Sequence, residues 1–353
     1  MRAARLHDRD DLRVEQIDEP TLKDGQVIVD IAWCGICGSD LHEYVLGPAP
    51  NNKVPHPLTG DTPPVAMGHE FCGRVRNPSS HSGLKDGDAV MVDPRVVCRK
   101  CGPCEKGATH ACEKLGYHGY NAGGGYAERA AILETMLYKL PDNVDLENAA
   151  VIEPLAVVVH AIKETKLTGW KDRDILVIGG GPIGLALIIA LKAFGAQKII
   201  VSEPAAGRRE QVKEFVMAAY NPVIDDVVGK CKEATGGKGM GIVFDCAGVP
   251  AGLEVGFAAL GFEGQYMNVA VWEKPMVIPV MTFMFKHINI RSAIIFSDED
   301  FKETMQMLAD GKLVGYEKLI TGRIRLEDIV EKGFNELINN KDEHIKILVS
   351  TRI

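Results

Sequence analysis

Four cysteines in one short segment are the first residues of this sequence whose spacing suggests chemistry. The segment reads "CRKCGPCEKGATHAC", and its cysteines are Cys98, Cys101, Cys104 and Cys112. A structural zinc ion takes four ligands in a closed tetrahedron, and the four are commonly all thiolates. The spacing therefore predicts a structural zinc site, with no open position at which catalysis could occur.

Two other interpretations of these cysteines are weaker. A loop of free or disulfide-bonded thiols would not need four cysteines at such close spacing. An iron–sulfur cluster is commonly bound by a run whose last cysteine is followed directly by proline, whereas Cys112 is followed by Glu113. A metal-bound lobe that stabilises the fold is the prediction.

A second pair of metal-capable residues, His69 and Glu70, lies in "PVAMGHEFCGR". Neighbouring residues of a β-strand point to opposite faces, so we expect that this pair cannot easily hold one ion from one side. By themselves they would be interpreted as a packed histidine and a surface carboxylate.

In "CGIC", Cys34 could form a redox pair with Cys37, but strand alternation favours a core position for Cys34. Packing is also predicted for the isolated cysteines Cys72, Cys231 and Cys246.

A glycine-rich turn lies between the apolar run "DILVI" and the helical stretch "IGLALIIALKAFGA". Gly179, Gly181 and Gly184 match the GxGxxG pattern of dinucleotide-binding βαβ units. In that pattern the glycines permit a tight turn, a close approach of the pyrophosphate and close packing of helix on strand. We expect the helix to open at Gly184, with Pro182 and Ile183 in the turn, and its free N–H groups to bind the phosphates.

The choice of nicotinamide cofactor is predicted from Glu203, which ends the next apolar run, "KIIVSE". A carboxylate at this point accepts hydrogen bonds from the adenosine ribose and repels a 2′-phosphate, which favours NAD over NADP. Arg208 and Arg209 argue the other way, because arginines nearby can hold that phosphate. A solvated helix face would explain both arginines equally well.

The elements that must position these residues fall into two kinds. Residues 1 to about 150 carry short β-type runs between glycine- and proline-rich turns. From "DILVI" onward, apolar strands alternate with helical stretches, as in parallel βαβ units. A length of 353 residues also favours two domains.

Composition narrows the classes of partner. The net charge of -8 argues against a nucleic-acid partner, and no apolar run is long enough to span a bilayer. The charged start "MRAARLHDRDD" does not have the pattern of a signal peptide. We therefore expect a cytoplasmic protein that acts on a small molecule, with neither nucleic acid nor membrane as a partner.

The motifs occur in the order typical of one family. "CGICGSDLHEY", "GHE", the four-cysteine segment, "EPLAVVVHA" and "GGGPIG" follow one another as in the zinc-containing medium-chain alcohol dehydrogenases, and the resemblance covers essentially the whole chain. The implied fold class is α/β, with a GroES-like β-rich catalytic domain and a Rossmann domain with a doubly wound parallel sheet. The catalytic domain would comprise residues 1–155 and 290–353, and the NAD-binding domain residues 156–289.

The resemblance also implies a catalytic zinc, and hence two zinc ions per chain. Cys37 and His69 would bind it, with Glu153 on or near the ion and Glu70 able to exchange on and off. Catalytic zinc keeps three protein ligands and one open position. It lowers the pKa of bound water from 15.7 to about 7, and an alcohol should respond similarly, which makes the alcohol a better hydride donor.

The proton released from the alcohol needs a route to solvent. Ser39, two residues after Cys37, is placed to receive it, and the resemblance implies a relay through the cofactor ribose to His42. The alternatives are that Ser39 is a helix cap before "DLHEY" and that His42 is an ordinary surface residue.

The substrate expectation also comes from the resemblance. "GSDLHEYVLGP", "PHPLTGDTPPVAMGHEFCG" and "NVAVWEKP" look most like the 2,3-butanediol dehydrogenases, which implies interconversion of (R,R)-2,3-butanediol and acetoin by a homodimer or homotetramer. A polyol dehydrogenase, acting on sorbitol or xylitol, is the alternative within the class. A catalytically inactive cofactor- or zinc-binding protein is the alternative in another class. The chain departs from the family pattern at His110 and in "LGYHGYN" after Cys112.

Overall fold

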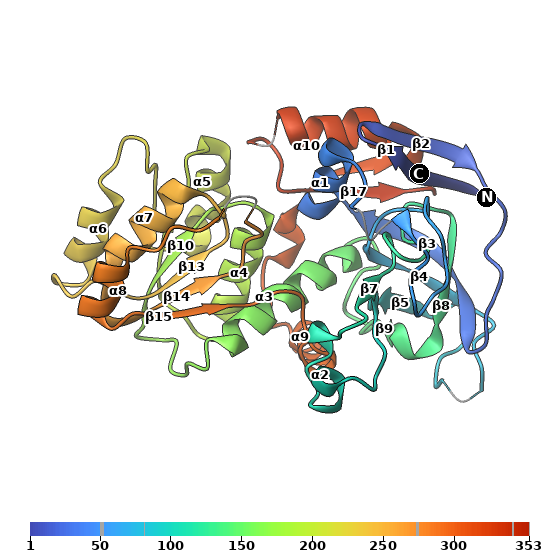
Figure 1. Ribbon diagram of the computed structural model, residues 1–353, viewed down its shortest axis with the longest axis horizontal. Helices are drawn as coiled ribbons and strands as arrows, with labels where there is room; N and C mark the ends of the chain where they lie inside the picture. The colour runs from blue at the N-terminus through green and yellow to red at the C-terminus, as the bar shows by residue number, and fades with distance from the viewer. Residues whose placement is uncertain (50–52, 81, 273–274, 341, 353) are drawn as a thin grey trace. The chain divides into compact units, whose positions relative to one another are not determined.

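A computed structural model describes residues 1–49, 53–80, 82–272, 275–340 and 342–352 (Figure 1). Part of the stretch "NVAVWEKP" therefore lies outside the described residues. The chain divides into two units. The first unit comprises Met1–Glu153, Ser297–Asp310 and Ile320–Ile353, and the second comprises Pro154–Phe296 and Gly311–Leu319.

The first unit is built on a seven-stranded sheet. Six strands run in the order β16 (Ile320–Arg325), β17 (Lys346–Ser350), β3 (Gln26–Gly35), β4 (Glu70–Arg76), β5 (Ala89–Val92) and β9 (Leu137–Lys139), and β8 (Arg129–Leu133) also pairs with β3. Only β16 and β17 are parallel among these pairs. The first half of β3 alternates between buried and half-buried residues, whereas its second half is buried throughout. That change places the end of β3, next to Cys37, deep in the unit.

Shorter elements surround this sheet. The strands are β1 (Arg2–Asp8), β2 (Asp11–Gln16), β6 (Arg95–Val96) and β7 (Gly116–Tyr117). The helices are α1 (Gly38–Leu46), α2 (Gly102–Glu105), α9 (Asp298–Ala309) and α10 (Asn335–Asn339). Single turns of 3-10 helix lie at η2 (Thr109–Ala111), η3 (Glu134–Met136), η4 (Ala149–Val151) and η7 (Leu326–Asp328), and the π-helical turn η8 covers Ile329–Phe334.

The second unit contains a six-stranded parallel sheet. Its strands lie in the order β12 (Ala218–Tyr220), β11 (Lys198–Ser202), β10 (Asp174–Ile178), β13 (Met240–Asp245), β14 (Leu260–Asn268) and β15 (Asn289–Ser292). Counted along the chain this is the order 3-2-1-4-5-6 of a Rossmann sheet, which reverses between β10 and β13. Parallel strands are buried on both faces, which explains why every residue of β10 and β11 after the first is buried. The predicted fold class is therefore confirmed.

Helices connect the parallel strands. They are α4 (Pro182–Ala193), α5 (Ala206–Val212), α6 (Val227–Ala234), α7 (Pro250–Ala259) and α8 (Val280–Lys286), with short turns η5 (Lys213–Phe215) and η6 (Tyr316–Leu319). Helix α3 (Ile152–Glu164) crosses from the first unit into the second. None of the helices in the described part of the chain is both long and apolar enough to cross a membrane.

Two boundaries differ from the sequence-based expectations. The second unit extends to Phe296, because β15 pairs with β14 as the sixth strand of the parallel sheet, and it also includes Gly311–Leu319. The expectation that the helix after the glycine turn opens at Gly184 is wrong. Helix α4 begins at Pro182, with Gly181 as its N-cap, because proline is well suited to the first turn of a helix, where no N–H partner is needed.

Candidate functional site

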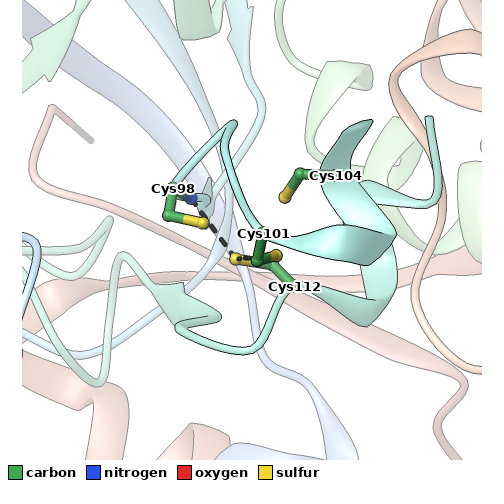
Figure 2. Close-up of side chains that lie close together, drawn as sticks. All are labelled: Cys98, Cys101, Cys104 and Cys112. Carbon is green, nitrogen blue, oxygen red and sulfur yellow. Dashed lines mark hydrogen bonds between the residues drawn. The ribbon is translucent and has the colours of Figure 1, made fainter. Parts of the chain in front are cut away.

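The four cysteines of residues 98–112 converge in the structure, although they lie on a loop with little regular structure. Their sulfur atoms all lie within 4.8 Å of one another, and Figure 2 shows the four side chains pointing toward one centre. The Sγ atoms of Cys101 and Cys112 are 4.0 Å apart, which is too far for a disulfide bond. Sulfurs in a tetrahedron around zinc, at a Zn–S distance of about 2.3 Å, would lie about 3.8 Å apart. The geometry therefore fits a four-thiolate metal site.

Electrostatics within this cysteine cluster also fit a bound cation. A backbone hydrogen bond from Lys100 lowers the pKa of Cys98 to about 6, whereas burial raises the pKa of Cys104 to about 12. Backbone N–H groups of Cys98 and Lys114 donate to Cys112 Sγ at 3.3 and 3.4 Å. Four thiolates so close together would repel one another without a central cation.

A buried arginine fixes the cysteine cluster to the rest of the first unit. Arg95 is fully buried and binds both carboxylate oxygens of Asp93, at 2.9 and 2.6 Å. It also donates to Thr109 Oγ1 at 2.9 Å, within the cysteine segment, and to Asp298 at the start of α9 at 2.8 Å. Arg99 forms a further ion pair with Asp298. This network links a locally folded loop to a helix about 190 residues away in sequence.

A second cluster gathers Cys37, His69 and Glu70, which each offer one ligand atom within 4.8 Å of the others. Cys37 is the N-cap of α1, and Glu70 is the first residue of β4. The expectation that His69 and Glu70 cannot serve one ion from the same side is wrong. His69 precedes the strand and follows Gly68, whose φ of 89° turns the chain, so strand alternation does not apply to this pair.

Glu70 is held by a lysine that the sequence analysis did not identify. Both of its carboxylate oxygens accept hydrogen bonds from Lys346 Nζ of β17, at 2.7 and 2.5 Å, and both side chains are buried. Lys346 also donates to the backbone oxygen of Ile36. Gly35 is required beside this pair, because a Cβ there would lie 2.1 Å from Glu70 Oε2. No local motif around Lys346 indicated this contact, since 276 residues separate the partners.

Asp40 is the second residue that sequence reasoning missed. It is fully buried and accepts hydrogen bonds from the Tyr126 hydroxyl (2.7 Å), the Tyr120 hydroxyl (3.2 Å) and the Cys37 backbone N–H (3.0 Å). Its Oδ1 lies 3.4 Å from Nδ1 of His69. Burial lowers the pKa of His69, but the charges of Asp40 and Cys37 outweigh that effect and the pKa lies well above its usual value. The cluster is therefore rich in negative charge and suited to a cation.

Glu153 lies near this cluster but is not one of the three residues whose ligand atoms meet. It lies in the first turn of α3 and is 5% exposed. Burial raises the pKa of Glu153 to about 8, against the opposing effect of His69. The structure thus places Glu153 in the electrostatic surroundings of His69 and Glu70 without a direct contact to either.

The two predicted relay residues lie on α1. The Ser39 hydroxyl is 3.5 Å from Nε2 of His69, and His42 lies one turn further along the helix at an exposed position. The alternative that Ser39 is the helix cap is wrong, because α1 already begins at Gly38 and Cys37 occupies the cap position.

The segment that departed from the family pattern forms one wall of the second cluster. The rings of Tyr117 and Tyr120 lie 6.0 and 5.3 Å from the ring of His69. Burial raises the pKa of both phenols well above the usual value, so both remain neutral hydrogen-bond donors. In the sequence, only the aromatic residues of "LGYHGYN" could have indicated that this segment forms a wall beside His69.

The glycine turn of the second unit has the geometry that a dinucleotide needs. Gly179 has a φ of 93°, and a Cβ at Gly184 would lie 1.9 Å from the backbone oxygen of Gly179. Pro182 and Ile183 are half-buried and begin the first turn of α4, directly after the N-cap Gly181. Both glycines therefore permit a packing of strand and helix that no other residue allows.

Glu203 contacts this turn through its carboxylate. Its carboxylate accepts hydrogen bonds from the backbone N–H groups of Gly180 (2.7 Å) and Ala205 (2.8 Å). The guanidinium of Arg208 would lie 3.3 Å from a Cβ at Gly181, whereas Arg209 donates to the backbone oxygens of Glu203 and Pro204. Of the two arginines, Arg208 is thus the one beside the glycine turn.

Comparison with known proteins agrees with both units. Residues 23–142 match the alcohol dehydrogenase GroES-like domain, and residues 182–310 match the zinc-binding dehydrogenase domain. The chain belongs to the zinc-binding alcohol dehydrogenase family and is an oxidoreductase of that family.

Individual relatives of this chain include butanediol and polyol dehydrogenases. The chain is 38% identical to the (R,R)-butanediol dehydrogenase of Bacillus subtilis over 99% of both chains. It is 32% identical to D-xylulose reductase A of Aspergillus oryzae, over 94% of this chain and 91% of the relative. The crystal structure of 2R,3R-butanediol dehydrogenase from Bacillus subtilis superposes with a TM-score of 0.89 and covers 99% of each chain.

Proposed function

We propose that the protein interconverts (R,R)-2,3-butanediol and acetoin with NAD and zinc. The observation that carries this proposal is the 38% identity, over 99% of both chains, to a relative named for that reaction. The relative named D-xylulose reductase is less similar, at 32%, and supports a polyol as the second candidate substrate.

Two zinc ions per chain fit the residues present. Cys37, His69 and Glu70 offer the sulfur, nitrogen and oxygen donors of a catalytic site, with Glu153 as a nearby carboxylate. Cys98, Cys101, Cys104 and Cys112 offer the closed thiolate set of a structural site. When bound at the first site, zinc supplies a Lewis acid for the alcohol or carbonyl oxygen of the substrate.

The chain's own residues prepare that first site. Asp40 lies beside Nδ1 of His69 and so orients the ring with Nε2 free to act as a ligand. Lys346 neutralises Glu70 and holds both of its oxygens. The Ser39 hydroxyl is positioned to receive the proton of the substrate alcohol, and His42, exposed on the same helix, transfers it to water.

NAD is the proposed cofactor, because the Glu203 carboxylate stands beside the glycine turn, where a 2′-phosphate would be repelled. We expect Glu203→Ser to move the ratio of kcat/KM values toward NADP by at least about tenfold, an effect of about 1.4 kcal/mol. Adding Arg208→Ala should reverse much of that gain, because Arg208 lies beside Gly181. A wild-type enzyme that already prefers NADP would contradict the assignment of Glu203.

A homodimer or homotetramer is proposed from exposed apolar side chains in the second unit. Helix α8 exposes Met281 (62%) and Phe285 (77%), and Val277 just before it is 81% exposed. Water-exposed apolar clusters of this kind commonly mark protein interfaces. Sedimentation of the purified protein will measure its mass. A cytoplasmic location is proposed because none of the nine cysteines forms a disulfide bond, as expected in a reducing compartment.

One assay separates the candidate functions. NADH formation is measured with each butanediol stereoisomer and with sorbitol, xylitol and threonine. We expect the highest kcat/KM with (R,R)-2,3-butanediol. Preference for sorbitol or xylitol would instead identify a polyol dehydrogenase. Absence of turnover with every substrate, in a protein that holds both zinc ions, would favour the inactive binding protein.

A further inference from the structure

A cavity of about 490 Å³ lies in the first unit, and no residue of either cysteine-containing cluster lines it. None of Cys37, His69, Glu70 and Glu153 lines it. Its volume is within the range of pockets that bind small organic ligands, which is about 300 to 1,000 Å³. Neither the proposed reaction nor the structural zinc site requires this space.

The floor of the cavity is open because its side chains are small or apolar. Ala66, Ala122, Gly123 and Ala130 contribute little volume, and Val96 adds an apolar wall. Each of the three alanines is less than 5% exposed. An apolar ligand body therefore fits the floor.

Three basic residues that line the cavity have carboxylate partners. Arg5 binds Glu15, Lys23 binds Asp61 at 2.6 Å, and Arg129 binds Glu19. Because these three basic side chains already have partners, and because the exposed carboxylates Asp18 and Asp24 also line the cavity, the lining does not favour an anionic ligand.

One polar side chain in the floor of the cavity, His118, has a ring nitrogen that is available to a ligand. His118 is 3% exposed and lines the cavity. Its Nδ1 lies 2.8 Å from the backbone oxygen of Gly123, and a carbonyl can only accept, so Nδ1 carries the proton. Burial lowers the pKa of His118, so the ring is neutral near pH 7 and Nε2 carries a lone pair. Among the described residues, Nε2 has no hydrogen-bond partner.

We propose that this cavity is a second binding site, which takes a small uncharged alcohol with an apolar body and donates its hydroxyl hydrogen to Nε2 of His118. A ketone or aldehyde of the same shape offers only an acceptor and would leave Nε2 unpaired. The site therefore distinguishes an alcohol from its oxidised form. It does not rest on the proposed substrate.

The position of His118 places this site next to the candidate metal centre. Tyr117 and Tyr120, in the same segment, face the ring of His69, while His118 faces the cavity. The Thr59 hydroxyl donates to the backbone oxygen of Asn121 at 2.6 Å and connects the cavity wall to that segment. A ligand in the cavity thus contacts the residues that support the tyrosine wall.

The test uses three matched probes on the zinc-loaded protein without nicotinamide cofactor. They are 3-bromobenzyl alcohol, 3-bromobenzaldehyde and 3-bromotoluene. Anomalous scattering from bromine in soaked crystals locates each probe, and calorimetry measures its affinity. We expect bromine in the cavity and about fivefold tighter binding of the alcohol than of the other two, as one hydrogen bond provides.

Two variants test whether the preference for the alcohol depends on the imidazole of His118. In His118→Asn the side-chain amide keeps the donor to Gly123 but loses the second nitrogen, so the preference for the alcohol should disappear. His287→Asn, a histidine outside the cavity, should keep that preference and serves as the control. Bromine found only at the Cys37 cluster would overturn the proposal. Equal binding of alcohol and toluene to the wild-type protein would also overturn it, and that comparison needs no variant.

Discussion

The two cysteine-containing clusters of the first unit are assembled in opposite ways. All four ligand candidates of the cysteine cluster come from residues 98–112, and the cluster is closed. The second cluster takes Cys37 and His69 from positions 32 residues apart, and it depends on Asp40, Tyr120, Tyr126 and the distant Lys346. A stabilising site can be built from one loop, whereas a site for chemistry needs supporting contacts from several parts of the fold.

The largest expected difference between the clusters is in activity. Cys37→Ala should remove one of two zinc ions and lower kcat by at least about a thousandfold, because several kcal/mol of transition-state stabilisation are lost. The fold should be kept, with a melting temperature close to that of the wild type. Cys34→Ala, a buried cysteine three residues earlier, is the control and should keep both ions. Full activity of Cys37→Ala would refute its role as a ligand.

The cysteine cluster should respond in the opposite way. Cys101→Ser should remove the other zinc ion and lower the melting temperature by roughly 10 °C or more, since structural zinc contributes directly to folding. Activity measured at low temperature should be affected much less. The control is Cys231→Ser, a buried cysteine outside both clusters, which should still hold two zinc ions. An unchanged melting temperature in Cys101→Ser would contradict the structural assignment.

Lys346 tests whether the second cluster depends on distant support. Lys346→Met leaves the Glu70 carboxylate buried without its partner, which should destabilise the protein by about 3–5 kcal/mol in denaturant unfolding. The matched control is Lys332→Met, which breaks an exposed pair with Asp328 and should change stability by less than about 1 kcal/mol. Adding Glu70→Gln to Lys346→Met should recover part of the loss. Equal effects of the two lysine substitutions would mean that the buried pair contributes no more than a surface one.

The smallest effects are expected along the proton route. Ser39→Ala should lower kcat by about a hundredfold with normal NAD binding, because general acid–base groups contribute about 10²- to 10⁴-fold. His42→Ala should lower kcat by less than about tenfold, because water can replace an exposed group, and it should alter the pH profile of alcohol oxidation. Ser39→Thr keeps a hydroxyl and should recover activity. Wild-type turnover and an unchanged pH profile in both alanine variants would show that the proton leaves by another route.

The sequence predicted the fold class well because its signals are local. The Rossmann sheet follows from alternating apolar strands and helices, and the glycine turn follows from three residues in a fixed pattern. The errors occurred where the local rule did not apply. Helix α4 starts two residues early because proline suits its first turn, and His69 escapes strand alternation because Gly68 turns the chain ahead of β4.

The sequence by itself identified the four clustered cysteines and the three glycines as candidates for binding metal and cofactor, since cysteine spacing and glycine patterns are properties of short segments. Cys37, His69 and Glu153 were expected at a metal ion only from the family resemblance. Only the tertiary structure decided that Lys346 neutralises Glu70, that Asp40 lies beside His69, and that Tyr117 and Tyr120 face the same ring. The reason is physical. A buried charge must have a partner, but that partner can come from any strand that the sheet brings alongside, and sheet pairing joins β17 to β3 across more than 300 residues.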